Sequence, residues 1–407
     1  MSGDPLVIIS DAICLGCGCL CDDITVEVDG DTVTEARRAC SIGRSWFMAN
    51  RVSALAEATI EGRAVSTDEA LDRAVTLLTK ARAPLVLGLA DASVETVRLA
   101  VALADHLGAL IDLTHADAAL PQLQAFQRVG RVTASLGEVR ERADTVVFWQ
   151  CDPVRTHPRH LERYSADSTG RFLNQGRVLL AADTEATATT TLAHHFLKFD
   201  AGQSYELLKT LKGLARGKDM DADEPTRSWA EHLKAARYGA LFYPTGLGDS
   251  AFYEALFSLV RDLNDGRRFA ALPLGGPGNS VGAEAVLAWQ TGFPTAVDFA
   301  SGAPRSFPPE TSATTRLQRG EVDVVLFVGK IGPLPIDVPS IVVAPDVPPE
   351  ATVGLVSGTL GIDEGGTVAR ADGVWLSLRP ALPAMRPTAR EWLAMLSGRI
   401  LGERTTP

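Results

Sequence analysis

The stretch PLVLGLA at residues 84–90, with the helical pattern that follows it at residues 93–107, decides the expected fold. Its uninterrupted apolar run, which ends in small residues, is typical of a parallel strand that is buried on both faces. From Val94 to Ala104 the apolar residues recur at the spacing of one helix face. Further strand-like runs lie at residues 109–113, 144–150 and 177–182. This repeated strand–helix alternation predicts a doubly wound α/β fold with a mostly parallel sheet.

A second block of the chain repeats this pattern beyond the polar stretch at residues 216–224. Its strand-like runs lie at residues 238–243, 269–274, 323–329 and 340–344. Two turn signals, at residues 364–366 and 372–373, predict a hairpin near the C-terminus. We therefore expect one α/β domain at residues 61–215, a second at residues 216–345, and a C-terminal hairpin and tail at residues 346–407 that pack on the body.

The first 60 residues differ from the rest, because they hold all but one of the 6 cysteines. The segment DITVEV at residues 23–28 alternates polar and apolar residues, as a half-buried strand does. A turn at Gly30 and a return strand at residues 32–35 would complete a hairpin, and a helix is expected at residues 42–55. Residues 1–60 are thus predicted to form a small cysteine-rich domain that binds a metal or a cluster.

The composition is that of a globular protein with a sizeable core. The 407 residues are 46% hydrophobic and 22% charged, and the formal net charge is −11. An acidic surface argues against nucleic-acid binding, and no basic patch or long apolar run indicates a membrane protein. The N-terminal residues lack a signal-peptide pattern, so a cytoplasmic location is expected, where clustered thiols indicate metal or redox chemistry rather than disulfides.

The strongest chemical signal is the set of cysteines Cys14, Cys17, Cys21 and Cys40. Three thiols lie within eight residues, interrupted by glycines that allow tight turns, and the fourth arrives from a separate segment. Four thiolates suit either a 4Fe–4S cluster or a structural zinc ion, and the spacing leaves both open, together with reduced thiols that bind nothing. Cys19 and Cys151 break the pattern and are expected to be small buried residues.

The cysteine segment and three later stretches resemble one family. CLGCGCLCDDI at residues 14–24 and ACSIGRSWF at residues 39–47 are similar to the start of molybdopterin oxidoreductases, and most of all to the B subunit of formylmethanofuran dehydrogenase. The long stretch at residues 137–165, WQTGFPTAVDF at residues 289–299 and GIDEGGTVARADGV at residues 361–374 resemble the same protein. The resemblance implies a 4Fe–4S cluster on the N-terminal cysteines, a bis-pterin tungsten or molybdenum centre held by two α/β domains, and a missing C-terminal domain carried by a partner subunit.

One departure from the family pattern affects the expected chemistry. The family's metal-ligating cysteine, and the histidine after it, fall at Ala118 and Ala119. Neither side chain can bind a metal or carry a proton, so the pterin-bound metal would lose its protein ligand. Nearby polar side chains, which do not occupy the matching positions, are Asp112, His115 and Asp117, the last of which has an oxygen that could in principle ligate.

This pattern resembles the B subunit of the formyltransferase/hydrolase complex of methylotrophs. The resemblance implies a structural and assembly subunit, without an active site of its own, in a complex that converts formyl-tetrahydromethanopterin to formate through a methanofuran-type carrier. The implied partners are the transferase, hydrolase and small subunits, with no nucleic acid and no membrane. Two other hypotheses compete with it, namely an active tungsten or molybdenum formylmethanofuran dehydrogenase subunit and a small iron–sulfur electron carrier. The long α/β body argues against the carrier.

Other candidate residues have ordinary structural explanations beside functional ones. His157, Arg159 and His160 follow a strand end, where open α/β sheets bind ligands, and a loop held by hydrogen bonds is the alternative that we favour. Adjacent histidines such as His194 and His195 point apart and are expected to be ordinary surface or core residues. The glycines Gly275, Gly276, Gly278, Gly365 and Gly366 mark either a phosphate cradle or, more commonly, tight loops.

Overall fold

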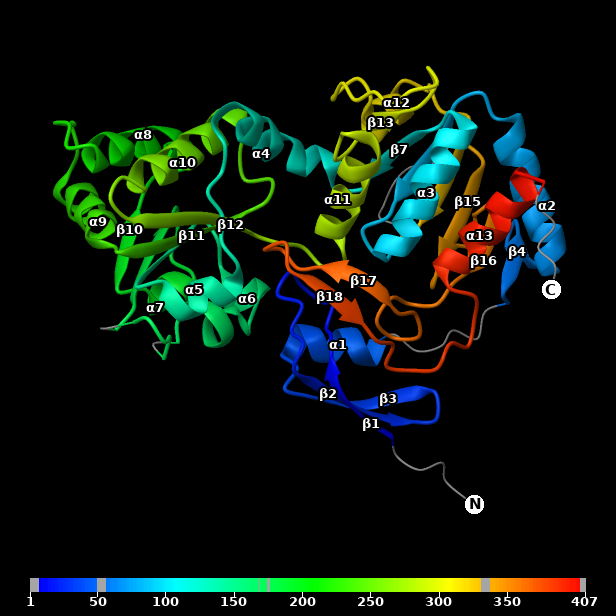
Figure 1. Ribbon diagram of the computed structural model, residues 1–407, viewed down its shortest axis with the longest axis horizontal. Helices are drawn as coiled ribbons and strands as arrows, with labels where there is room; N and C mark the ends of the chain where they lie inside the picture. Colours follow the sequence, from blue (N-terminus) through cyan, green and yellow to red (C-terminus); the bar gives the residue numbers. More distant parts are fainter. Residues whose placement is uncertain (1–6, 50–55, 168, 174–175, 331–336, 403–407) are drawn as a thin grey trace. The chain divides into compact units, whose positions relative to one another are not determined.

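The structure is a computed structural model that describes residues 7–49, 56–167, 169–173, 176–330 and 337–402 (Figure 1). The chain forms two compact units. Unit 1 comprises residues 1–117, 277–370 and 375–407, and unit 2 comprises residues 118–276 with 371–374. The predicted α/β class is confirmed in both units, since each contains a mostly parallel sheet covered by helices.

The N-terminal part of unit 1 is a three-stranded antiparallel sheet with one helix. Its elements are β1 (Val7–Ala12), β2 (Ile24–Asp29), β3 (Thr32–Arg37) and α1 (Ser41–Ala49). The predicted hairpin is therefore present as β2 and β3, and β1 adds a strand to it. The predicted helix at residues 42–55 is observed as α1, and its last part, residues 50–55, lies outside the described residues.

The body of unit 1 is an eight-stranded sheet of order β13-β7-β6-β14-β15-β16-β4-β5. Its strands are β4 (Ala58–Ile60), β5 (Arg63–Ala64), β6 (Pro84–Gly88), β7 (Leu110–Leu113), β13 (Val297–Asp298), β14 (Val324–Val328), β15 (Ser340–Ala344) and β16 (Val353–Val356). The five central strands from β7 to β16 are parallel, in the doubly wound order 2-1-3-4-5. A hairpin of β17 (Gly366–Ala369) and β18 (Trp375–Leu378) confirms the predicted C-terminal turn pair.

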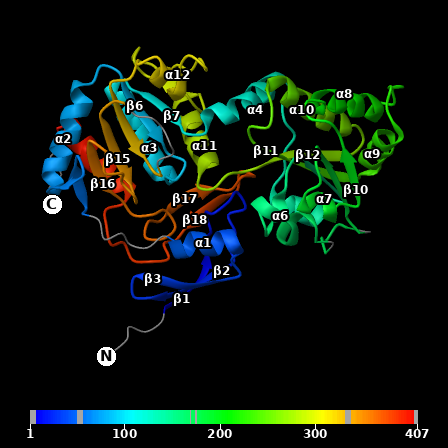
Figure 2. The same cartoon turned by 180° about the vertical axis from the view of Figure 1, so that it is seen from behind.

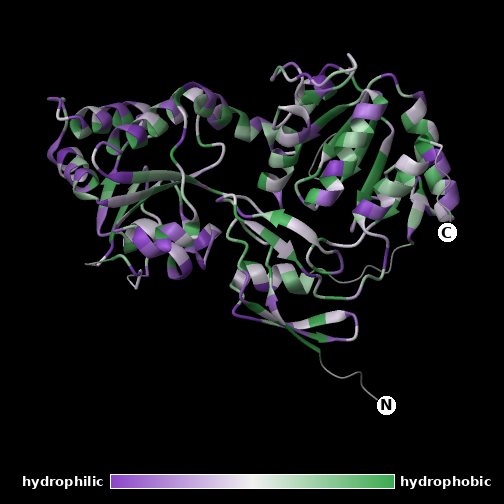
Figure 3. Ribbon diagram, viewed as in Figure 1, coloured by the Kyte–Doolittle hydropathy of each residue, from purple (hydrophilic) through white to green (hydrophobic). Residues whose placement is uncertain are grey.

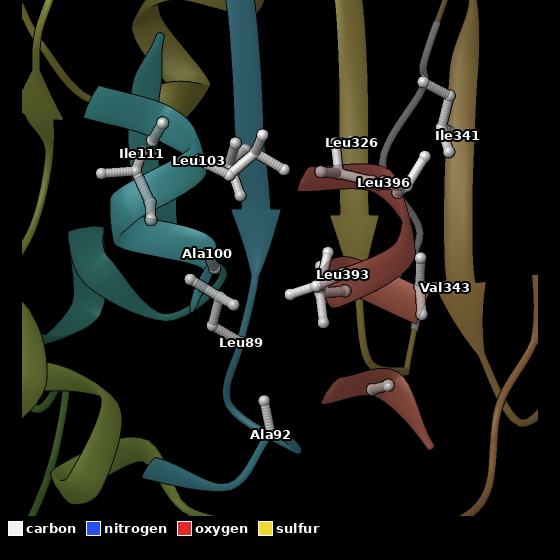
Figure 4. Close-up of a cluster of buried hydrophobic side chains, with 14 of the residues drawn as sticks. Leu89, Ala92, Ala100, Leu103, Ile111, Leu326, Ile341, Val343, Leu393 and Leu396 are labelled. Atoms are coloured by element: carbon white, nitrogen blue, oxygen red, sulfur yellow. The ribbon is translucent and has the colours of Figure 1, made fainter. Parts of the chain in front are cut away.

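Helices cover both faces of this sheet. Helices α2, α3 and α13 lie on one of them (Figures 1 and 2). The helices of unit 1 are α2 (Thr67–Lys80), α3 (Val94–Leu107), α11 (Ser280–Thr291), α12 (Ala313–Gln318) and α13 (Ala389–Ile400). Leu393 and Leu396 of α13 pack with Leu326 and Val343 of the sheet (Figure 4). Hydrophobic residues concentrate on the strands (Figure 3), because both faces of a parallel sheet are buried.

Unit 2 is a five-stranded, wholly parallel sheet of order β10-β9-β8-β11-β12, again a doubly wound arrangement. Its strands are β8 (Thr145–Trp149), β9 (Val178–Asp183), β10 (His195–Lys198), β11 (Tyr238–Pro244) and β12 (Arg268–Leu274). Its helices are α4 (Ala116–Val129, with residues 118–129 in this unit), α5 (Leu136–Arg142), α6 (Pro153–Thr156), the π-helix η1 (Leu161–Ser165), α7 (Ala188–Leu192), α8 (Ser204–Ala215), α9 (Glu224–Ala235) and α10 (Ser250–Leu263). Helices α8, α9 and α10 lie over one face of the sheet, and α5, α6 and α7 lie over the other (Figures 1 and 2).

The compact units differ from the predicted contiguous domains at residues 61–215 and 216–345. Strand β6 pairs with β14, although about half of the chain separates them, and residues 118–276 form their own sheet between these two strands in the sequence. The C-terminal segment at residues 346–407 also does more than pack on the body, since it supplies β16 to the sheet and α13 to the core. The pattern of apolar runs indicates where strands occur but not which strands become neighbours.

No helix in the described part of the chain is both long and apolar enough to cross a membrane.

Candidate functional site

The four predicted ligand cysteines lie in two segments of the N-terminal part of unit 1. Cys14, Cys17 and Cys21 occupy the connection between β1 and β2, and Cys40 immediately precedes α1. A backbone hydrogen bond of 2.9 Å from the Cys14 N–H to the Cys21 carbonyl closes this connection into a loop. This hydrogen bond brings together the two ends of the segment that carries the three cysteines.

Two glycines lie close to the sulfur atoms of this segment. The Gly16 N–H donates to Cys14 Sγ and the Gly43 N–H donates to Cys40 Sγ, each at 3.4 Å. A Cβ atom on Gly43 would lie 3.0 Å from Cys14 Sγ and 3.8 Å from Cys40 Sγ. Cys14 and Cys40 thus flank the same glycine, although 26 positions separate them in the sequence. Backbone N–H groups directed at thiolate sulfurs are one way in which proteins support iron–sulfur clusters.

The thiols of this loop have strongly different acidities. Burial raises the pKa of Cys14 to about 12. A hydrogen bond from Cys19 lowers the pKa of Cys17 to about 7. Cys19 is buried, as predicted. It also forms a hydrogen bond with Cys17, one of the predicted ligands, which the spacing did not indicate. Because thiolates are the ligands, binding of a metal or cluster here would release protons, one of them from Cys14.

The donor set, which consists of four thiols, fits a thiolate-bound group in its chemistry. Among residues 7–49 and the other described ranges, no three His, Cys, Asp or Glu side chains are arranged as ligands of one metal ion. The set Cys14, Cys17, Cys21 and Cys40 therefore remains a prediction, and so does the choice between a 4Fe–4S cluster and zinc.

Ala118 lies on the surface, in the first turn of α4 and beyond the end of β7. Its methyl group has no lone pair, and neither has that of the buried Ala119. In unit 2, a Cβ atom on Gly246 would lie 3.4 Å from the Cβ atom of Ala118, so the loop after β11 approaches this position closely. These residues do not fit the protein ligation of a tungsten or molybdenum ion.

Two of the polar residues near the end of β7, Asp112 and His115, are occupied in structural contacts. Both carboxylate oxygens of Asp112, which is 1% exposed, accept hydrogen bonds. The donors are the N–H groups of Leu113, Ala296 and Ala313 and the hydroxyl of Thr295, at 2.6–2.9 Å. Burial raises the pKa of Asp112. His115 pairs with Glu284 of α11 at 3.1 Å. Asp112 therefore links β7 by hydrogen bonds to residues 295–296 and to Ala313, and it is not free to act as a metal ligand.

The histidines after β8 lie at the carboxyl end of the parallel sheet of unit 2. This is the point between β8 and β11 where the strand order reverses, and where open α/β sheets bind ligands. His157 lies 2.8 Å from the Gly275 carbonyl through Nε2, and His160 lies 2.9 Å from the Ser165 hydroxyl through Nδ1. Burial lowers the pKa of His157, and lowers that of His160 to about 3.

These histidines are therefore neutral and held by their neighbours. His160 Nε2 has no hydrogen-bond partner among the described residues, and the His160 ring packs edge-on at 4.5 Å against Phe242. Arg159 pairs with Glu162 at 2.5 Å. This arrangement supports the favoured interpretation of a loop held by internal contacts, because a proton carrier at neutral pH would need a higher pKa.

The remaining candidates have separate structural contacts. His194 Nδ1 accepts from the Leu179 N–H at 2.9 Å, whereas His195 stacks on His232 at 3.8 Å, so the adjacent histidines do not share one partner. A Cβ atom on Gly278 would lie 2.4 Å from the Ala90 carbonyl oxygen, and one on Gly366 would lie 2.5 Å from Ser93. Gly278 permits close approach of another backbone, and Gly366 permits close approach of a side chain, which agrees with the tight-loop interpretation.

Two buried side chains that organise this chain were missed by the sequence analysis. Asn279 is fully buried, and its amide donates to the Ala92 carbonyl and accepts from the Ala369 N–H, each at 2.8 Å. Arg177 of unit 2 donates to backbone carbonyls of four residues, which are Val139, Arg140, Ala143 and Tyr164. Only a pattern of polar residues inside apolar surroundings could have indicated them.

No family model matches the chain. Two curated relatives match nearly its whole length, and both are B subunits of tungsten-containing formylmethanofuran dehydrogenase 2. The relative from Methanococcus maripaludis is 31% identical over 410 residues, which cover 93% of this chain and 94% of that protein. The relative from Methanocaldococcus jannaschii is 31% identical over 408 residues, which cover 92% of this chain and 94% of that protein.

A third relative is the B subunit of the formyltransferase/hydrolase complex Fhc from Methylorubrum extorquens. It is 29% identical over 275 residues, which cover 67% of this chain and 75% of that protein. A solved structure of the same bacterium's complex, FhcABCD with methylofuran, contains a chain that matches with a TM-score of 0.76 and 26% identity, over 86% of this chain and 100% of that chain. The predicted resemblance to the B subunits of formylmethanofuran dehydrogenase and of the formyltransferase/hydrolase complex is confirmed.

Acetylene hydratase from Pelobacter acetylenicus has the same fold. It matches with a TM-score of 0.65 and 11% identity, over 97% of this chain and 70% of that chain, and this likeness concerns the fold alone. It agrees with the predicted molybdopterin oxidoreductase-like architecture. Because relatives 31% identical match more than nine-tenths of its length, the chain belongs to the family of the formylmethanofuran dehydrogenase B subunit.

Proposed function

We propose that this chain is a structural and assembly subunit of a formyltransferase/hydrolase complex. That complex would convert formyl-tetrahydromethanopterin to formate through a methanofuran-type carrier, in the oxidation of one-carbon units. In this proposal the redox site is lost, and the transfer and hydrolysis are carried out by other subunits. The similarity to the B subunit of the Methylorubrum extorquens complex supports the proposal.

The observation that carries the proposal is the alanine at position 118. At the position where the family resemblance expects a sulfur ligand, the side chain is an exposed methyl group that cannot coordinate a metal. Asp112, the buried carboxylate nearest to Ala118 in the sequence, already accepts hydrogen bonds from four donors. The fold is kept, whereas the atom that held the catalytic metal is absent.

A second candidate function is an active tungsten or molybdenum subunit of formylmethanofuran dehydrogenase. It is favoured by one observation, because the two relatives that match more than nine-tenths of the chain are named as tungsten-containing enzymes. On this hypothesis the pterin alone, or an oxygen ligand such as Asp117, would hold the metal. We favour the first function, since the family resemblance expects a cysteine ligand at the position that Ala118 occupies, and an alanine side chain supplies no ligand.

The decisive experiment is purification of the native complex that contains this chain, followed by analysis of tungsten, molybdenum and pterin. The proposal predicts none of these in stoichiometric amount, together with formyl transfer and hydrolysis that fall when the gene for this chain is deleted. Stoichiometric tungsten or molybdenum with pterin would establish the second candidate. Full transfer and hydrolysis in the deletion strain would exclude the assembly role.

Cofactor, partners and location follow from the same proposal. Cys14, Cys17, Cys21 and Cys40 would hold a 4Fe–4S cluster or a structural zinc ion, and we favour the cluster because the spacing is that of the family. The partners would be the transferase, hydrolase and small subunits, in the cytoplasm. Analysis of iron, acid-labile sulfide and zinc in the purified complex distinguishes the two occupants, and the absence of all three would exclude both.

A further inference from the structure

Unit 2 has a cleft at the amino ends of its strands, with a volume of about 610 Å³. The starts of β8, β9 and β11 line it, together with the ends of α5 and α9 and with Phe172. His157 and His160 follow the carboxyl end of β8, at the opposite edge of the same sheet. The cleft is therefore separate from the candidate ligand positions described above, and the proposed function does not use it.

Two arginines give this cleft a positive character. Arg142, at the end of α5, and Arg237, just before β11, both line it and are both exposed. In the described part of the chain, neither guanidinium forms an ion pair with a carboxylate. The carboxylate of Asp144 also lines the cleft, but it accepts the backbone N–H groups of Arg237 at 3.1 Å and of Tyr238 at 3.3 Å. Two unpaired cations in a chain with a net charge of −11 indicate a site for an anion.

Planar side chains lie beside these cations. The ring of Phe172, which is 56% exposed, has the guanidinium carbon of Arg142 at 4.2 Å from its centroid. A guanidinium stacked in this way still directs its N–H groups outward in its own plane, where a carboxylate or phosphate can accept two of them. His232 also lines the cleft, and its ring stacks on that of His195 at 3.8 Å. The cleft thus combines donors for an oxyanion with flat surfaces for a ring.

We propose that this cleft binds a small molecule that carries a planar ring and an oxyanion, either a phosphate or a carboxylate. The oxyanion would accept hydrogen bonds from Arg142 and Arg237, and the ring would pack against Phe172. The volume lies within the roughly 300–1,000 Å³ of small-molecule sites. A concave shape favours a small molecule over the docking of a partner subunit, which uses flatter surfaces.

Calorimetric titration of the full chain tests the proposal with four probes. Adenosine monophosphate and indole-3-acetate each carry a ring and an oxyanion, and they distinguish the phosphate from the carboxylate. Adenosine and inorganic phosphate each carry one of the two features. We expect at least one of the first two probes to bind at least about tenfold more tightly than adenosine and phosphate, since both features contribute. If all four probes fail to bind at millimolar concentration, the proposal is wrong.

Variants locate the binding in the cleft. We expect Arg237→Gln and Arg142→Gln each to weaken the better probe about tenfold or more, because a charge-assisted hydrogen bond is lost. Arg171→Gln is the matched control, since the Arg171 side chain is 85% exposed, pairs with Glu141 and does not line the cleft. All variants should melt at the wild-type temperature. Equal affinities of Arg237→Gln and Arg171→Gln for the better probe would overturn the proposal. It would also be overturned if Arg142→Gln and Arg237→Gln impaired assembly of the complex but left binding of the probe unchanged.

Discussion

The N-terminal cysteine segment and the connection from β7 to α4 are the two regions where the family resemblance expects sulfur ligands, and they differ. The first retains Cys14, Cys17, Cys21 and Cys40, and the sulfur atoms of Cys14 and Cys40 lie close to Gly43. The second has Ala118 in place of the ligand. On the proposed function, the cysteine segment would still stabilise the fold through its bound group, whereas a metal ligand at position 118 would no longer be needed.

The largest expected effect concerns the cysteine segment. We expect Cys40→Ser to lose most of the bound iron or zinc and to lower the melting temperature, because a structural metal contributes folding free energy on the order of 10 kcal/mol. Metal analysis and thermal denaturation of the purified protein measure this. The control is Cys151→Ala, at a buried thiol outside the segment. Wild-type metal content in Cys40→Ser would show that Cys40 is not a ligand.

The connection after β7 should instead respond as a purely structural region. We expect Asp112→Ala to lower the free energy of unfolding by about 4 kcal/mol, because it leaves four buried donors without an acceptor. Chemical denaturation measures the change. Asp72→Ala is the control, since that side chain is 73% exposed and its loss should cost less than about 1 kcal/mol. Similar losses for both variants would contradict a structural role for Asp112.

Glu364, near the start of α13, is expected to make a pH-dependent contribution to the free energy of unfolding. Burial raises the pKa of Glu364 from 4.5 to about 7, so between these values the folded state binds more protons than the unfolded state. The contribution of this group to stability is therefore full below pH 4.5 and decreases, by up to about 3 kcal/mol, as the pH rises to 7. Denaturation of wild type and Glu364→Gln across this range measures the difference.

The comparison for Glu364 needs an ordinary carboxyl as its control. Glu350 is exposed, so Glu350→Gln should follow the wild-type pH dependence. If Glu364→Gln also follows the wild type throughout, the buried carboxyl does not titrate as described.

The smallest expected effect is that of restoring a thiol at the lost position. Ala118 is exposed, so Ala118→Cys should change the free energy of unfolding by less than about 0.5 kcal/mol. We also expect no stoichiometric tungsten or molybdenum in the variant complex, measured by elemental analysis. Uptake of either metal by Ala118→Cys, but not by the wild type, would show that the rest of the metal site is intact.

Local patterns predicted many elements of the fold closely. The run predicted at residues 340–344 is β15 with the same bounds, and the C-terminal turn signals mark the hairpin of β17 and β18. Strand β10 was missed, because HFLK is short, half polar and at the edge of its sheet. The division into domains differed most, because the pairing of β6 with β14 depends on contacts between distant segments.

The candidate site shows the same limit. The cysteines were found from their spacing, because short-range geometry is encoded in short-range sequence. The approach of Gly43 to the sulfur of Cys14 arises only when separate segments meet, and the hydrogen bond between Cys19 and Cys17 depends on how their loop folds. Asp112 was identified as a polar residue near a former ligand, but its saturation by residues about 200 positions away could not be predicted.

The sequence by itself determined the α/β class, the spacing of the four cysteines and the absence of a sulfur at position 118, because each depends on residue type or on a short periodic pattern. The tertiary structure decided which strands share a sheet, why Asn279 and Arg177 are buried, and where a cleft with two unpaired arginines lies. The physical reason is that burial and hydrogen-bond satisfaction belong to neighbours in space, and most of these neighbours are distant in the chain.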